Sequence, residues 1–466
     1  MLASSTFTYQ TRIMTASDSR SLVDQYAALY GKVERTLFAA LAAGKSAAAL
    51  KPGFCTRFDI TSRQYNAISM CLKGKIASIQ ERRKGLIQEA KIKISEIKKA
   101  IQKLEKVKPK DDAHKKRIDF SLHHKKRGLD RKNARLAAMQ DDEKNGIVRL
   151  CFGSKKRFSQ QFHLAENGFA DHAAWQTAWR DSRSSQFLVI GSRDETSGCQ
   201  SCVATMNADG SFNLQLRLPN GLASGERKHL SFVNVWFPYG QQQLAHSLAA
   251  GRAISYRFKR DIEGWRVYAS TEVLASKTIT HTLAGVIGLD INADHLAVTQ
   301  IDRFGNPVSF HRLDCVTYGQ SSDQASAIIG DQVKILVQLA KDTSRPIVME
   351  NLDFGKKKAA LYDENPRYAR MLSGFAYAEI KAVLTSACLR AGVEIIEINP
   401  ALTSVIGAVN FAQRLGISVH QGAALAIARR ALGLSERPTL RGVSVPTRRG
   451  GHVTFALPAR NRAKHV

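Results

Sequence analysis

The sequence predicts a multidomain α+β protein in which a helical block interrupts a β-rich domain and an α/β domain follows. Three observations predict this class. Residues 15–146 are helical in pattern and strongly basic, short alternating runs recur over 147–280, and buried strands alternate with helices over 281–435. At 466 residues the chain is too long for one ordinary core, so we expect more than one domain.

The β-rich part is marked by alternating side chains. Residues 4–13 alternate and are rich in β-branched and aromatic residues, so residues 1–14 are expected to hold a strand. Further short runs follow between 187 and 271, separated by turn residues such as Asp209-Gly210. The pattern predicts an antiparallel sheet or small barrel, and the N-terminal strand is expected to pair with it.

The net charge restricts the partners. Lys and Arg number 69 against 40 Asp and Glu, which gives a net charge of +29 and a pI of about 10.0. Such a chain repels itself unless a polyanion neutralises it, so nucleic acid is the expected partner, and a solvated basic surface is the alternative. The apolar runs are shorter than a membrane helix needs, and the N-terminus lacks the apolar block of a signal peptide, so no membrane is expected. Seven scattered cysteines favour a reducing, cytoplasmic compartment.

About half of the excess charge lies in one predicted helical hairpin. Residues 73–135 hold 22 Lys and Arg against 8 Asp and Glu, a net charge of +14. Apolar residues spaced by threes and fours from Ile87 to Leu104 predict a coiled-coil-like helix, and residues 108–112 predict a turn before a second basic helix. A solvated hairpin is the alternative to a nucleic-acid surface. The candidate contacts are Lys98, Lys99, Lys125, Lys126 and Arg127.

Two carboxylates lie at the ends of buried strands in the α/β part. Asp290 lies near the end of GVIGLDI, and Glu350 lies in PIVMENL. A carboxylate there is costly unless a cation or hydrogen bonds compensate for its burial. Hard Mg²⁺ prefers such oxygen ligands, and paired ions would suit phosphodiester hydrolysis. Ordinary strand-end carboxylates bound to backbone amides or lysines are the alternative.

Several segments together resemble the TnpB (OrfB) family of transposon-encoded RNA-guided nucleases. GLDINADHLAVTQIDRFGNPV resembles the first RuvC motif of this family and of the related type V CRISPR effectors, and VMENLDFGKKK resembles the second. VEIIEINPALTS resembles the strand and Thr-Ser that lead into the family's zinc ribbon. IVRLCFGSKKRF and DETSGCQSCVATMNADGSFNLQLRLP resemble the divergent TnpB-related group. The resemblance covers most of the chain and is strongest over 285–435.

The resemblance implies a wedge-like β-barrel interrupted by a helical recognition insert, an RNase H-like (RuvC) domain, and a basic C-terminal tail over 436–466. It implies a guide RNA that pairs with double-stranded target DNA. Asp290 and Glu350 would be the first two catalytic and metal-binding acids, with Mg²⁺ or Mn²⁺ as cofactor. Further nucleic-acid candidates follow the second motif: Lys356, Lys357 and Lys358. We expect a monomer in a prokaryotic cytosol, associated with the nucleoid.

The sequence departs from the family at two places. Between Thr403 and Ser418 there is no cysteine, and the isolated pair Cys199 and Cys202 lacks a second pair, so zinc is not expected. The third acid is missing from ISVHQGAALAIA, where Ser418 or His420 faces the place of the acid. We take His420 as the candidate third catalytic and metal-binding residue. A polar helix residue without a catalytic role is the alternative.

Three functions follow from these expectations. The first is an RNA-guided, Mg²⁺-dependent endodeoxyribonuclease. The second is a nuclease-deficient RNA-guided DNA-binding protein, which the incomplete set of acids favours. The third is an RNA-independent transposase or resolvase accessory protein. Cleavage in Mg²⁺ separates the first from the second, and dependence on RNA separates both from the third.

Overall fold

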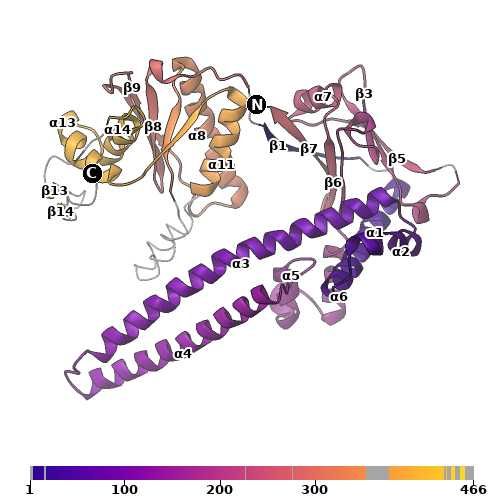
Figure 1. Ribbon diagram of the computed structural model, residues 1–466, viewed down its shortest axis with the longest axis horizontal. Helices are drawn as coiled ribbons and strands as arrows, with labels where there is room; N and C mark the ends of the chain where they lie inside the picture. The colour runs from indigo at the N-terminus through magenta and orange to yellow at the C-terminus, as the bar shows by residue number, and fades with distance from the viewer. Residues whose placement is uncertain are drawn as a thin grey trace. The chain divides into compact units, whose positions relative to one another are not determined.

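The chain divides into two compact units, an N-terminal unit (Ala3–Leu274) and a C-terminal unit (Ala275–Val466 with Met1–Leu2), shown in Figure 1. The computed structural model describes residues 4–14, 17–225, 227–274, 276–352, 377–434, 437, 442–446 and 452–456. None of the helices in these ranges is long and apolar enough to cross a membrane.

The strands of the N-terminal unit form two open sheets, with the orders β1-β7-β6-β2 and β3-β4-β5. Phe258 of the first sheet and Phe232 of the second have ring centroids 5.8 Å apart, so both sheets contribute to one core. The strands are β1 (Ser4–Arg12), β2 (Gln186–Val189), β3 (Cys202–Met206), β4 (Phe212–Arg217), β5 (His229–Val235), β6 (Ile254–Asp261) and β7 (Gly264–Leu274). The expected closed barrel is not found among the described residues, because β2 and β3 are joined by a loop and the short turn η3 (Thr196–Gly198) and do not pair.

The first strand of the chain pairs with the last strand of the N-terminal unit. β1 pairs antiparallel with β7 from Ser4 opposite Leu274 to Arg12 opposite Arg266, which is the kind of pairing that the sequence predicted for it. Helices α1 to α6 therefore lie in the sequence between two strands of the same sheet.

The helices of the N-terminal unit include three that the sequence analysis did not anticipate. Residues predicted as β-rich form α5, α6 and α7, and α6 begins where the side chain of Asp171 accepts a hydrogen bond from the amide of Ala174. The helices are α1 (Ser17–Ala42), α2 (Ala47–Phe58), α3 (Ser62–Glu105), α4 (Asp112–Lys144), α5 (Lys155–Ser159), α6 (His172–Ser182) and α7 (Gln241–Ala249). Short 3₁₀ turns are η1 (Gln160–Phe162), η2 (Ala165–Asn167) and η4 (Asn220–Leu222).

Helices α3 and α4 run side by side as a long hairpin (Figure 1). Ile87, Ile94 and Ile101 are spaced by seven and buried, and Ile118 of α4 is buried with them on the hairpin. The capping box at Thr61 begins α3, and the side chain of Asp111 caps α4. At 44 residues α3 is about 66 Å long, so it presents its basic side chains along an extended surface.

The C-terminal unit is built on one mixed sheet with the order β10-β9-β8-β11-β12. β8, β9 and β10 are antiparallel neighbours, whereas β8, β11 and β12 run parallel. The strands are β8 (Val286–Ile291), β9 (His295–Ile301), β10 (Pro307–Asp314), β11 (Ile347–Glu350) and β12 (Ile395–Ile398). This alternation of strands and helices confirms the α/β architecture expected for the second half of the chain.

Helices cover both faces of this sheet and bury two cores. On one face, α8 and α11 pack on Ile287, Leu289 and Met349, and on the other, α14 packs on Val286 and Val348. The helices are α8 (Ser322–Thr343), α11 (Tyr377–Ala391), α12 (Thr403–Ile406), α13 (Gln413–Leu415) and α14 (Val419–Ala431), with the 3₁₀ turn η5 (Thr282–Ala284) and the π-helical turn η7 (Gly407–Ala412). In the tail, β13 (Gly442–Pro446) and β14 (His452–Ala456) form a hairpin that the sequence analysis did not anticipate.

Small residues bring α14 close to the sheet. A methyl group at Gly288 of β8 would lie 2.9 Å from the Cβ of Ala428 and closer still to the carbonyl oxygen of Ala424. In the turn η7, which packs against α14, a methyl group at Gly407 would lie 2.6 Å from the Cα of Ala423. Glycine at these two positions therefore sets the depth at which α14 lies, and with it the place of the first turn of the helix.

Candidate active site

Asp290 and Glu350 occupy adjacent positions in register on neighbouring parallel strands. The register pairs Ile347 with Ile287 and continues to Met349 beside Leu289, so the next step places Glu350 beside Asp290. Alternation along each strand puts both carboxylates on the face that α14 covers. Neighbouring strands are about 4.8 Å apart, so two carboxylates share one small region at the ends of their strands.

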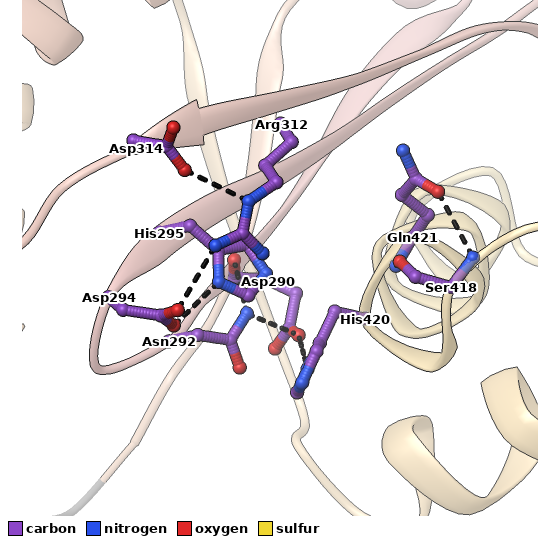
Figure 2. A network of polar contacts seen from close by, with 9 residues as sticks. All are labelled: Asp290, Asn292, Asp294, His295, Arg312, Asp314, Ser418, His420 and Gln421. Carbon is purple, nitrogen blue, oxygen red and sulfur yellow. Dashed lines mark hydrogen bonds and ion pairs between the residues drawn. The ribbon is translucent and has the colours of Figure 1, made fainter. Parts of the chain in front are cut away.

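The carboxylate of Asp290 is held by two neighbours on one oxygen. Asn292 donates from Nδ2 to Oδ2 at 3.1 Å, and Nδ1 of His420 lies 3.2 Å from the same oxygen (Figure 2). Among the described residues nothing donates to Oδ1, and the side chain is 14% exposed. Asp290 therefore keeps one oriented carboxylate oxygen for an external ligand.

His420 lies in the first turn of α14. Ser418 begins this helix with a capping box, in which its hydroxyl accepts from the amide of Gln421 and the side chain of Gln421 accepts from the amide of Ser418 (Figure 2). The side chain of His420 is 50% exposed, so solvent can reach its ring. The amino end of a helix carries partial positive charge, which favours carboxylates nearby.

A second histidine, which the sequence analysis missed, adjoins His420. The ring of His295 lies edge-on to that of His420, with centroids 5.1 Å apart. Nδ1 of His295 lies 2.7 Å from Oδ1 of Asp294, and Arg312 donates to Oδ2 of Asp294 at 3.0 Å (Figure 2). Burial raises the pKa of Asp294, but the hydrogen bonds from His295 and Arg312 outweigh it, so the pKa is lowered overall. The sequence feature that could have revealed His295 is the pair Asp294-His295, four residues after Asp290. The sequence analysis interpreted this stretch only as strand and turn.

Glu350 is oriented by two other elements. The hydroxyl of Thr403, at the start of α12, donates to Oε1 of Glu350, and Thr403 is buried. The hydroxyl of Tyr377 in α11 donates to the backbone carbonyl of Glu350 at 2.6 Å, and burial raises the pKa of Tyr377 to about 12. Thr403 is the first residue of α12, which η7 and α13 follow in the described chain.

The acid pair suits a hard divalent cation, although the described residues contain no set of three His, Cys, Asp or Glu side chains placed to hold a metal. Mg²⁺ is commonly held by one or two carboxylates and completes its octahedral shell with water and substrate phosphate. Asp290 and Glu350 supply that kind of oxygen donor. The predicted role of His420 as a third ligand stays a prediction, since its Nδ1 is directed to Asp290.

The predicted nucleic-acid residues fall in different environments. Lys98, Lys99 and Arg127 are exposed on the hairpin, Lys125 is half-buried, and Lys126 forms an ion pair with Glu105 at 2.8 Å. The second group, Lys356, Lys357 and Lys358, lies outside the described residues.

The cysteine pair of the β-rich part is in the core. Cys199 and Cys202 are both buried, and burial raises the pKa of each thiol, which disfavours the thiolate that binds metals.

Comparison with known proteins gives structural likeness only. No protein-family model and no curated protein matches this sequence. T. thermophilus RuvC in complex with a Holliday junction substrate matches at 15% identity over 32% of this chain and 96% of its own, with a TM-score of 0.23. A Cas12f1–sgRNA–target DNA complex matches at 11% identity over 92% and 99%, with a TM-score of 0.34, and a Cas12i–crRNA–dsDNA complex at 8% over 76% and 60%, with a TM-score of 0.29. Likeness at this level carries no conclusion about function.

Proposed function

We propose that this protein is a Mg²⁺- or Mn²⁺-dependent endodeoxyribonuclease with an RNase H-like (RuvC) domain, directed to DNA by a guide RNA. The observation that carries the proposal is the pair of carboxylates Asp290 and Glu350, which occupy adjacent register positions on parallel strands. The pair faces the first turn of α14, where His420 contacts Asp290. The mixed strand order of the C-terminal unit, with β8 central and β11 parallel to it, is compatible with an RNase H-like domain.

In this site each residue has a distinct task. A bound divalent ion supplies an activated water and neutralises the charge on the phosphate during hydrolysis. Asp290 and Glu350 would hold it through carboxylate oxygens. His420 and Asn292 both occupy Oδ2 of Asp290, which leaves Oδ1 for the ion. Thr403 fixes Oε1 of Glu350 by donating to it.

The cleavage test uses substitutions that keep shape and remove charge. Asp290→Asn and Glu350→Gln should each lower nicking of supercoiled plasmid in Mg²⁺ or Mn²⁺ by at least about a hundredfold, because each removes a metal-binding carboxylate. Asp331→Asn, an exposed acid on α8, should cut like wild type. Retained nicking in both site variants would refute the assignment of these acids.

Guidance by RNA is the finer part of the proposal. It is supported by the basic α3–α4 hairpin and by the resemblance of the sequence motifs to transposon-encoded TnpB proteins. The protein should copurify with one dominant RNA species, and sequencing that RNA would define a matching DNA target. Random cellular fragments in place of one species would contradict guidance while leaving metal-dependent cleavage untouched.

A second candidate function is guided binding without cleavage. The observation that favours it is the histidine at the position of the third acid, together with the lack of a three-ligand cluster in the described part of the chain. Target binding that requires RNA, with no cut in Mg²⁺ or Mn²⁺, would establish this function in place of the first.

A further inference from the structure

A cavity of about 420 Å³ lies within the N-terminal unit, where α1, α3 and the segment 150–153 meet the four-stranded sheet. Its volume falls in the range of small-molecule sites, about 300–1,000 Å³. Apolar walls come from Phe152 and Leu188, and polar groups come from Tyr30, Lys75 and Arg183.

One wall carries a buried hydroxyl without a strong partner. Tyr30 of α1 is 5% exposed, and among the described residues its hydroxyl has no partner stronger than the thiol of Cys71, which lines the same cavity. Burial, and next the neighbouring Cys71, raise the pKa of Tyr30, so the group remains a neutral donor. A buried hydroxyl without a strong partner is costly, and this hydroxyl lines an open volume that a ligand can fill.

The same cavity has cationic groups without acidic partners. Nε of Arg183 is buried and has no hydrogen-bond partner, and its guanidinium lies over the ring of Trp179 at 5.2 Å. Neither Arg183 nor the adjacent Arg35 forms an ion pair with a carboxylate of the described residues, and burial lowers the pKa of both. The acid of the cavity, Glu34, is already neutralised by Lys75 at 2.6 Å. The cavity therefore has an excess of donors and positive charge, which suits an anion.

We propose that this cavity binds one unstacked nucleotide of a single nucleic-acid strand. Its phosphate meets Arg183, the hydroxyl of Tyr30 donates to it or to the base, and the base lies against Phe152 and Leu188. A strand is favoured over a free metabolite because Lys75 of the cavity lies on α3, the helix that carries the basic hairpin surface. The inference rests on nucleic-acid binding in the proposed function and does not depend on cleavage.

The test measures binding of labelled strands of about 15 nucleotides, RNA and DNA separately, by fluorescence anisotropy without divalent ions. The full chain is used after copurified nucleic acid is removed in high salt. Tyr30→Phe should weaken binding about 3- to 10-fold, because it removes one hydrogen bond. It should leave the Tm of the free protein unchanged or raised, because the lost hydroxyl has no partner stronger than the thiol of Cys71. Arg183→Gln should weaken binding about tenfold or more.

Two further variants separate the cavity from general charge. Arg180→Gln removes a cation from α6, the helix that ends just before Arg183. Arg180 does not line the cavity, so its loss should change affinity less than about threefold. Cys151→Phe fills the cavity and should weaken binding as much as Arg183→Gln while the protein stays folded.

Each outcome of the test is decisive. Weaker binding by Tyr30→Phe and Cys151→Phe for RNA alone, or for DNA alone, supports the inference and identifies the strand. If Tyr30→Phe and Cys151→Phe bind as tightly as Arg180→Gln, the inference is overturned, and the cavity holds only water. Loss of nicking in the acid variants has no bearing on this result, so the two proposals fail separately.

Discussion

Gly288→Ala should loosen α14 from its sheet. The added methyl group would lie 2.9 Å from Cβ of Ala428 and closer to the backbone oxygen of Ala424, against ordinary contacts of 3.4 Å or more, so the helix must retreat by at least 0.5 Å. Overpacking of this kind costs about 1–3 kcal/mol, and a backbone oxygen cannot rotate away, so we expect the upper end. Alanine regains about 0.5–1 kcal/mol of backbone entropy in the strand. The net loss of stability is therefore about 2 kcal/mol.

Hydrogen–deuterium exchange on the full chain measures this loss in the correct unit. Amides of β8 and β9 should exchange about 30-fold faster, since 1.4 kcal/mol corresponds to a factor of ten. All four tryptophans, at 175, 179, 236 and 265, lie in the N-terminal unit, so the Trp emission should not change. Gly330→Ala is the matched control, because no atom lies within 4 Å of its added methyl group and it should slow exchange in α8. Unchanged exchange of β8 in Gly288→Ala would refute the close packing of α14.

Two further predictions concern the site and the hairpin. His420→Ala should abolish nicking, whereas His420→Asp should retain or raise it in Mg²⁺ because carboxylate is the better ligand for a hard cation, and wild-type rates in His420→Ala would show a merely structural residue. Glutamate at Lys98, Lys99 and Arg127 should weaken RNA retention and lower the slope of log affinity against log salt concentration by about 2, at roughly 0.7 per lost single-strand contact. Arginine at the two lysines should preserve both the retention and the slope. An unaltered slope in the glutamate variant would place the RNA elsewhere.

The parts of the fold that follow a local period could be predicted from the sequence. The stripe from Ile87 to Leu104 is buried or half-buried along α3, and the apolar runs near 285 and 346 became β8 and β11. Closure of a barrel has no local signal, because it depends on whether the two edge strands of different sheets pair. The helix α6 was not predicted, because its two tryptophans and its Asp171 cap lie in a stretch dominated by strand-like runs.

The candidate site was only partly predictable for a related reason. A carboxylate at the end of an apolar strand is visible in the sequence, so Asp290 and Glu350 could be named. The contact of His295 with His420 and the hydrogen bond from Thr403 to Glu350 join residues far apart in the chain. Such contacts depend on how closely α14 and α12 approach the sheet, which the glycines at 288 and 407 determine.

If His420 stands in place of a third acid, as we propose, the site carries less negative charge, and this would affect the order in which ligands bind. A third carboxylate would leave three acidic groups to attract a cation before substrate arrives, whereas the site with His420 has two, Asp290 and Glu350. Mg²⁺ surrenders its water reluctantly and is then held by few protein oxygens, so phosphate oxygens must complete the site. In the proposed function, metal affinity and DNA binding would therefore be coupled more strongly than in a three-acid site. The smaller negative charge would also lower the repulsion that a DNA backbone meets on approach. In the proposed function, a site with two acids would admit the DNA strand more readily and hold the free ion less tightly than a site with three.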